Sequence, residues 1–340
     1  MIASPLRVRL FAAGTLLCSA AIPLGAQRPA ARSSGTPPAD PPYVVAATLP
    51  PAVDGRFLSG FEFDPVTEDL YALTDRALYR LKLTEKPDFG APIVDKVIWR
   101  MTLDRRDGRL FYATEDEIGY LDVRTPGARP VTVQADVSAI SLAYAQETGE
   151  LFASLSREPR VLVFDGRTGA RRTDIALPGW YGAGLTAAPR RVFLQVAGES
   201  GLYWIDPVAH EVQPWPMPRE VVTPAFLDAD PGSRFLVVAY DHEFLVFDVA
   251  SARVIGRVVT PSRPTIAFDP ETDRLIASWD DDPPPGFMAS YKVTSRALVD
   301  TGRIRKPSVA DVEVRGMPGG FIQRAGRGWL VWRAGAGASR

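Results

Sequence analysis

An apolar residue pair that recurs about every 40 residues is the feature that most limits how this chain can fold. Six of the pairs each follow a turn-forming segment, and a seventh near the C-terminus fits less closely. Consecutive pairs lie 40, 41, 41, 43, 40 and 46 residues apart. The pairs are Leu70-Tyr71, Leu110-Phe111, Leu151-Phe152, Val192-Phe193, Phe235-Leu236, Leu275-Ile276 and Phe321-Ile322. Self-similarity at such a period is the signature of a repeat architecture.

Each repeat contains four strand-like runs. The first run ends in an Asp-Pro turn in segments such as Phe61–Pro65 and Ile266–Pro270, and the second run carries the apolar pair. The 31 prolines and 28 glycines of the chain supply the turns that many short strands need. A period near 40 with four strands per period is typical of a propeller blade. We therefore predict an all-β fold, a seven-bladed β-propeller.

The two ends of the chain predict how the ring closes. The last repeat supplies three strands, near Val312–Arg315, Gly320–Arg324 and Trp329–Arg333, and then runs out. A strand-like segment, Tyr43–Leu49, stands directly before the first repeat. Pairing it with the last repeat would close the ring and remove the exposed sheet edges. We predict that the N-terminal strand completes the last blade, with one propeller domain over residues 43–336 and a short tail, 337–340.

The amino terminus predicts export. Residues 1–26 have two arginines followed by an uncharged apolar run over residues 10–22, and no acidic residue precedes Asp40. This pattern is typical of a secretory signal peptide, and the run is too short for a membrane-spanning helix of about 20 residues. Residues 27–42 are rich in Pro and Ala and predict a disordered spacer. We expect the mature protein to be periplasmic or extracellular, without a transmembrane segment.

Composition and charge restrict the classes of partner. The chain is 46% apolar and 23% charged, the balance of a soluble globular protein. Its 39 basic and 40 acidic side chains give a net charge of −1, so we expect no nucleic-acid partner. The single cysteine, Cys18, lies within the predicted signal, so the mature chain would contain no disulfide and no thiolate metal site. We expect a monomer.

Four aspartates end the third strand of successive repeats. They are Asp122, Asp165, Asp206 and Asp248. Each precedes a turn, where an Asp side chain can accept a hydrogen bond from the backbone two residues further on. We interpret these aspartates as turn-forming residues and not as catalytic ones.

The second strands and the third-strand endings carry a resemblance to a known family. Through segments such as Leu70–Asp75 and Phe111–Glu115, the chain resembles the YVTN-type seven-bladed β-propellers, which belong to the quinoprotein amine dehydrogenase-like propellers. The resemblance covers nearly all of the predicted mature chain. It implies a secreted, periplasmic or cell-surface propeller; most members are binding modules, and some relatives are lactonases or dehydrogenase subunits. No repeat contains the literal Tyr-Val-Thr-Asn, and the chain has no Asn.

One face of the predicted propeller is expected to carry the ligand site. The turns between second and third strands share this face with the crossovers to the next blade, which include Trp99 and Arg100. These turns carry charges at matched places in six repeats: Asp75, Arg76, Glu115, Asp116, Arg157, Glu158, Glu199, Asp241, His242, Glu243, Asp280, Asp281 and Asp282. They are either ordinary solvated turns or a binding surface for a cationic group, a divalent cation or a basic partner.

Two further segments allow two interpretations each. Trp180 and Tyr181, between glycines on a predicted crossover, either form a stacking platform for a sugar or aromatic ligand or cap the core between blades. The run Asp280–Asp282 precedes three prolines and is either a rigid loop or a weak contact for Ca²⁺ or a protein. Its aspartates lack the alternating spacing of a calcium loop.

Motifs for catalysis are missing from the sequence. The two histidines, His210 and His242, are predicted on opposite faces, and no nucleophile elbow, P-loop, HExxH or EF-hand pattern occurs. We expect no catalytic residues, no metal ligands and no cofactor. The sequence favours an exported, soluble propeller that binds a ligand or protein through its charged face. The alternative is a propeller hydrolase or lactonase that uses carboxylates, with or without a divalent cation.

Overall fold

The computed structural model describes most of the chain from residue 43 to residue 334. The described residues are 43–49, 52–53, 56–83, 89–177, 184–188, 190–196, 202–218, 226–229, 234–269, 272–279, 287–294, 296–305, 314–317, 320–325 and 328–334. All of them belong to one compact unit, residues 38–340. The predicted signal peptide, the spacer and the C-terminal tail lie outside the described residues.

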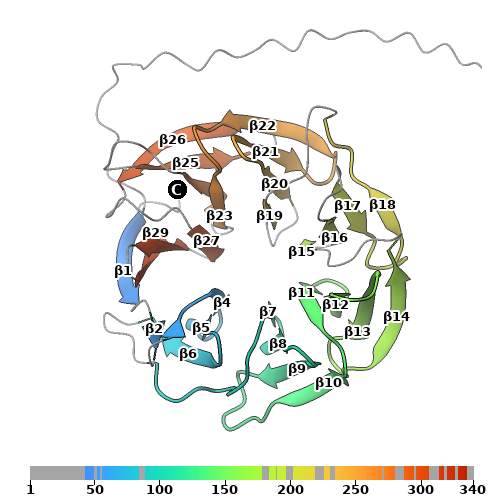
Figure 1. Ribbon diagram of the computed structural model, residues 1–340. Coiled ribbons are helices and arrows are strands. Elements are labelled where there is room, and N and C mark those ends of the chain that lie inside the picture. The colour runs from blue at the N-terminus through green and yellow to red at the C-terminus, as the bar shows by residue number, and fades with distance from the viewer. Residues whose placement is uncertain are drawn as a thin grey trace, which may run out of the picture. The chain divides into compact units, whose positions relative to one another are not determined.

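The strands form seven sheets arranged around a ring (Figure 1). The predicted seven-bladed β-propeller is thus confirmed. Blade 1 comprises β4 (Gly60–Asp64), β5 (Asp69–Leu73) and β6 (Leu78–Lys82). Blade 2 comprises β7 (Arg100–Asp104), β8 (Arg109–Ala113), β9 (Glu117–Asp122) and β10 (Val131–Ala135). Blade 3 comprises β11 (Ala139–Ala145), β12 (Glu150–Leu155), β13 (Arg160–Asp165) and β14 (Arg171–Ala176). Blade 4 comprises β15 (Gly184–Ala188), β16 (Arg191–Gln195), β17 (Leu202–Ile205) and β18 (Val212–Pro214).

The remaining strands complete the ring. Blade 5 comprises β19 (Phe226–Ala229), β20 (Phe235–Ala239), β21 (Glu243–Asp248) and β22 (Arg253–Val259). Blade 6 comprises β23 (Thr265–Asp269), β24 (Arg274–Ser278), β25 (Phe287–Val293) and β26 (Leu298–Arg305). Blade 7 comprises β27 (Val314–Met317), β28 (Gly320–Ala325), β29 (Gly328–Ala334) and β1 (Tyr43–Leu49). A separate hairpin pairs β2 (Ala52–Val53) with β3 (Arg56–Phe57). Among the described residues blade 1 has three strands, and an isolated bridge from Leu78 to Val94 occupies its outer edge. The described residues contain no helix that could cross a membrane.

The core lies between neighbouring blades. Every side chain of the second strands β12 and β20 is buried, because both faces of a central strand pack against adjacent sheets. One apolar cluster, for example, joins Phe152 and Val161 of blade 3 to Leu185 and Val192 of blade 4. Outer strands such as β14 are mostly exposed. This pattern explains why the apolar pairs of the second strands recur so regularly in the sequence.

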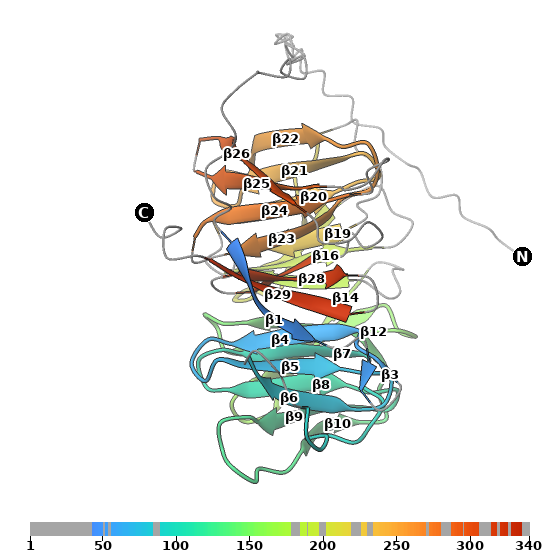
Figure 2. The ribbon, with the colours of Figure 1, turned by 90° about the vertical axis from the view of Figure 1, so that its left-hand side faces the viewer.

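The N-terminal strand completes blade 7, as predicted. β1 pairs antiparallel with β29, from Tyr43 opposite Ala334 to Leu49 opposite Trp329, and the two strands run side by side in Figure 2. The Tyr43 hydroxyl also donates a 2.9 Å hydrogen bond to Oδ2 of Asp269 in blade 6. The closing strand therefore holds both its own blade and the neighbouring one.

The third-strand aspartates form turns, also as predicted. Oδ1 of Asp122, Asp165 and Asp206 accepts a hydrogen bond from the backbone N–H two residues further on, over 3.1, 3.0 and 2.8 Å. Asp248 accepts instead from the backbone N–H and the hydroxyl of Ser251. Their carboxylates are therefore occupied by the turns that they shape.

Antiparallel pairing within the blades gives the ring two faces. We call the upper face the one with the turns between second and third strands, such as 74–77 and 114–116, and the crossovers between blades, such as 136–138. We call the lower face the one with the turns between first and second strands, such as 105–108, and between third and fourth strands, such as 166–170.

Candidate binding site on the upper face

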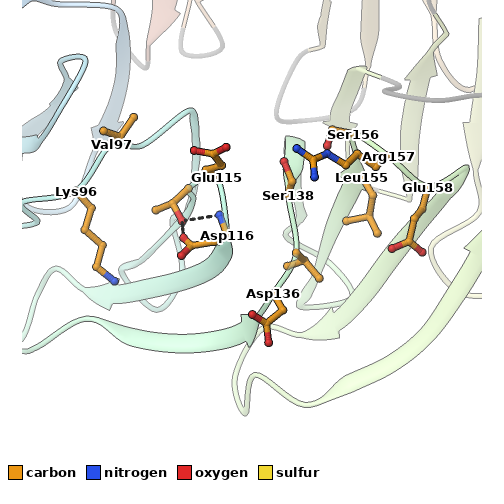
Figure 3. A pocket seen from close by; sticks show the side chains of 12 residues that line it. Lys96, Val97, Glu115, Asp116, Asp136, Ser138, Leu155, Ser156, Arg157 and Glu158 are labelled. Atoms are coloured by element: carbon orange, nitrogen blue, oxygen red, sulfur yellow. Dashed lines mark hydrogen bonds between the residues drawn. The ribbon is translucent and has the colours of Figure 1, made fainter.

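A pocket of about 720 Å³ opens on the upper face between blades 2 and 3 (Figure 3). We call it the upper pocket. Its walls are the turn 114–116 of blade 2, the segment 155–158 of blade 3, and residues of two crossovers. The crossover into blade 2 contributes Lys96 and Val97, and the crossover into blade 3 contributes 136–138.

A buried threonine shapes the blade 2 wall of the upper pocket. Oγ1 of Thr114, which is 4% exposed, accepts hydrogen bonds from the backbone N–H of Asp116 and of Glu117. The Asp116 carboxylate in turn accepts a 2.8 Å bond from this hydroxyl, and the Asp116 carbonyl accepts one from the N–H of Val137. The turn is thus fixed to the next crossover, and Glu115 at its tip stays exposed.

The upper pocket contains more carboxylates than bases. Its ionisable lining residues are Glu115, Asp116, Asp136 and Glu158 against Lys96 and Arg157. The two bases differ in their partners. Lys96 Nζ donates a 2.6 Å bond to Glu117 Oε1, whereas the Arg157 side chain makes no hydrogen bond or ion pair within the described part of the chain.

Glu115 and Arg157 lie on opposite sides of the opening in Figure 3. Glu158 is paired with Arg160, so its charge is already compensated. Asp136 has a φ of 58°, a left-handed conformation that Asp adopts more readily than most residues. That conformation turns the chain sharply between β10 and β11 and leaves the Asp136 side chain exposed at the rim.

A second pocket, of about 470 Å³, adjoins the first on the same face. Its lining includes Thr74 and Asp75 of blade 1 and the crossover residues Val97 and Trp99. Val97 lines both pockets. Val97 is 47% exposed and Trp99 37% exposed, and we call the apolar surface that they offer to a partner the apolar ridge.

The structure brings some of the predicted site residues together and separates others. Glu115, Asp116, Arg157 and Glu158 line the upper pocket, and Asp75 lines the adjoining one. Arg76 lies in the same turn as Asp75, and its N–H donates to Thr74 Oγ1.

The predicted residues of blade 5 line neither of these pockets. Glu243 accepts a 2.6 Å hydrogen bond from Arg257, and His242 Nδ1 lies 3.1 Å from the carbonyl oxygen of Pro261. Asp241 is exposed in the same turn. The other predicted residues lie outside the described residues: Trp180, Tyr181, Glu199, Asp280, Asp281 and Asp282.

Eight of the twelve lining residues of the upper pocket were not predicted from the sequence, and four of them show why. The crossovers contribute Lys96, Val97, Asp136 and Ser138. These segments have no repeated motif and differ in length between blades. The available signal was their position, since each stands just before the inner strand of the next blade. A crossover charge in that position necessarily reaches the upper face.

The described residues contain no group of three or more His, Cys, Asp or Glu side chains that could hold a metal ion. Most described carboxyls with lowered pKa values lie at structural turns, and Asp174 in β14 is paired with arginines. The guanidinium of Arg172 and the turn N–H of Thr168 hold the pKa of Asp165 far below its ordinary value. The Ser251 hydroxyl likewise lowers the pKa of Asp248 despite the opposing effect of burial. These shifts reflect turn formation and ion pairing on the lower face.

The fold and this geometry define a seven-bladed β-propeller with a polar pocket between two blades. No protein-family model and no curated protein matches the chain. Among solved structures, a chain from the crystal structure of a mitotic checkpoint complex is similar to it, with a TM-score of 0.63 and 11% sequence identity. The match covers 94% of this chain and 98% of that chain. At this identity the likeness concerns the propeller fold alone.

Proposed function

We propose that this chain is an exported propeller of the YVTN type that binds a protein partner through the upper face of blades 1–3. The partner presents a basic side chain to the upper pocket. The observation that carries the proposal is the pocket itself, in which carboxylates outnumber bases and Lys96 is already neutralised by Glu117. Charge complementarity of this kind selects partners and accelerates their association.

The apolar ridge supports a protein as the partner. Tryptophan is among the residues that contribute most to the binding energy of protein interfaces, especially where surrounding contacts exclude water from it. Trp99 and Val97 are exposed at the adjoining pocket, and Val97 also lines the upper pocket with its carboxylates. A partner that covers both pockets would bury this ridge at the centre of the contact. The similar solved chain comes from a protein complex, which is consistent with a propeller of this shape acting within an assembly.

Binding experiments with matched variants test the proposal. The purified protein is used to capture partners from an envelope extract of its source, and each captured partner is then titrated against variants. We expect two variants to weaken binding by about tenfold or more: the double variant Glu115→Lys with Asp136→Lys, and the single variant Trp99→Ala. Asp241→Lys, an exposed acid in the corresponding turn of blade 5, is the control and should change affinity by less than about twofold, because distant exposed charges are screened.

Equal affinities for the parent and the upper-pocket variants would contradict the proposal. A screen of ester and lactone substrates tests the hydrolase alternative in parallel. Hydrolysis that Glu115→Gln abolishes would replace binding with catalysis as the role of the pocket. Export is tested separately, by following the chain in cell fractions with and without residues 2–26. A chain that reaches the envelope without those residues would refute the predicted signal.

A further inference from the structure

A smaller pocket, of about 290 Å³, opens on the lower face between blades 2 and 3. We call it the lower pocket. Arg106 and Asp107 reach it from the turn between β7 and β8, and Thr148 from the turn between β11 and β12. Arg167 and Arg172 reach it from the turn after β13 and from β14. The concentration of guanidinium groups around one hollow distinguishes it from the acidic upper pocket.

We propose that the lower pocket binds a phosphate group, either free phosphate or the phosphomonoester of a small molecule, held by Arg106, Arg167 and the hydroxyl of Thr148. Guanidinium groups suit this ligand because their planar arrangement of N–H donors matches phosphate oxygens. The site is separate from the proposed function, because it lies on the opposite face of the ring.

The ion pairs within the lower pocket leave two arginines available. Asp165 Oδ2 is bound by Arg172, and its Oδ1 accepts from the N–H groups of Arg167 and Thr168. Arg172 also donates a 2.8 Å bond to Glu150, so its charge is compensated. Within the described residues, the side chains of Arg106 and Arg167 make no hydrogen bond or ion pair. Among the described residues that line the pocket, Asp107 is the one carboxylate left to oppose their two positive charges.

The hydroxyl oxygen of Thr148 is a buried polar atom without a partner. This Oγ1 is shielded from solvent and makes no hydrogen bond within the described residues. An unsatisfied buried hydroxyl costs about 1–3 kcal/mol, so such groups usually have a partner in the functional state of a protein. Thr148 lines the lower pocket, so a rotation of its side chain that turns the hydroxyl toward the opening would let it donate a hydrogen bond to a phosphate oxygen.

Both arginine-bearing turns are held in place before any ligand binds. Asp104 Oδ1 accepts hydrogen bonds from the N–H of Arg106, at 2.9 Å, and of Asp107, at 3.3 Å. Across the blade boundary, Arg109 Nη1 donates to the carbonyl oxygens of Gly166, at 2.6 Å, and of Arg167. Preorganised turns reduce the ordering cost of binding, which favours affinity for a small anion.

Isothermal titration calorimetry on the purified full chain tests the site, with inorganic phosphate and glycerol phosphate as the two probes and sodium chloride at equal ionic strength as the blank. We expect at least one probe to bind, and Arg106→Gln with Arg167→Gln to weaken binding by about tenfold or more. The control Arg296→Gln removes an exposed arginine from a lower-face turn of blade 6 and should leave affinity within about twofold.

Thr148→Val separates binding from folding. The variant should weaken phosphate binding by several-fold while leaving the thermal midpoint unchanged or slightly raised, because an unsatisfied buried hydroxyl is removed. Equal affinity for both probes identifies free phosphate as the ligand, and tighter binding of glycerol phosphate identifies a phosphomonoester. No heat with either probe, or equal affinity of the double arginine variant and the parent, would overturn the proposal.

Discussion

At the scale of single residues, a buried ion pair joins blades 1 and 2. Arg124 donates from Nε to Oδ2 of Asp64 over 2.9 Å and from Nη2 to Oδ1 over 2.8 Å. Asp64 is fully buried at the end of β4, and Arg124 follows β9 of the next blade. The pair therefore connects the lower-face turns of two sheets that share no backbone hydrogen bonds between their described strands.

Loss of Arg124 should destabilise the ring strongly. Arg124→Gln leaves the Asp64 carboxylate buried without its counter-charge, which we expect to lower the free energy of unfolding by about 3 kcal/mol. Arg190→Gln is the control, because Arg190 is 87% exposed in its ion pair with Glu147 and such pairs contribute about 0–1 kcal/mol. Urea unfolding followed by circular dichroism measures both. Similar losses in the two variants would refute the special role of the buried pair.

The same pair makes stability depend on acid. Burial by itself raises the pKa of Asp64, but hydrogen bonds from Arg124, Val66 and Thr67 outweigh it and place the pKa below its ordinary value of 3.8. A carboxyl with a lowered pKa stabilises the folded state above its unfolded pKa, and this contribution disappears as pH falls through the folded pKa. Stability should therefore decline below about pH 4, and less steeply in Arg124→Gln than in the parent.

Chemical unfolding between about pH 6 and pH 3 measures this slope. The comparison between parent and variant is essential, because Asp165 and Asp248 also have lowered pKa values and contribute to acid sensitivity in both proteins. Identical pH slopes in the parent and in Arg124→Gln would mean that protonation of Asp64 does not contribute to the loss of stability.

At the scale of elements, closure of the ring depends on one strand. β1 contributes Tyr43, Ala47 and Leu49 to the buried core, each less than 5% exposed, and covers the edge of β29. Without it, β29 would present unpaired backbone groups to solvent and to other chains. Blade 7 would then consist of three strands that cannot seal the interfaces to blades 6 and 1.

Removal of β1 should cost the protein its cooperative stability. A chain that begins at residue 50 is expected to unfold at least about 10 °C lower than the parent, or to aggregate on purification. A chain that begins at residue 43 is the control and should keep the midpoint of the parent, because it retains every described strand. Scanning calorimetry measures the difference. Equal midpoints for the two shortened chains would contradict closure by β1.

The elements also show which features of the protein can be predicted from sequence. The second strands repeat because both of their faces must be apolar, and the pairing of β1 with β29 follows from a last repeat that is one strand short. The crossovers follow no such rule. Asp136 and Val97 reach the upper pocket through local backbone turns, and which blades share a pocket depends on how those turns pack. The sequence period therefore predicts the face of the propeller that carries a pocket, but not the blades between which the pocket lies.

At the scale of the whole molecule, the structure places two pockets of different chemistry at the same blade boundary. The upper pocket contains an excess of carboxylates, and the lower pocket contains arginines of which Arg106 and Arg167 are unpaired within the described residues. The chain as a whole is nearly neutral, with a net charge of −1. A net charge near zero is therefore compatible with local charges of opposite sign, and a binding site on either face would not be visible in the overall composition.

Salt should separate the electrostatic and apolar contributions to binding at the upper face. The exposed carboxylates Glu115 and Asp136 are screened within a Debye length of about 8 Å at physiological salt and about 3 Å at 1 M. Partner affinity should therefore fall as sodium chloride is raised, mainly through slower association, whereas burial of Trp99 is insensitive to screening. Surface plasmon resonance over a salt series measures both rate constants.

The charge variant and the tryptophan variant should respond differently to salt. The double variant Glu115→Lys with Asp136→Lys should bind weakly at low salt, and its affinity should rise as salt is raised, because its pocket repels a basic group and salt screens that repulsion. Trp99→Ala should weaken binding by a similar factor at every salt concentration and act chiefly on dissociation, because it removes buried apolar area and not charge. A parent affinity independent of salt would mean that the carboxylates of the upper pocket do not recognise the partner.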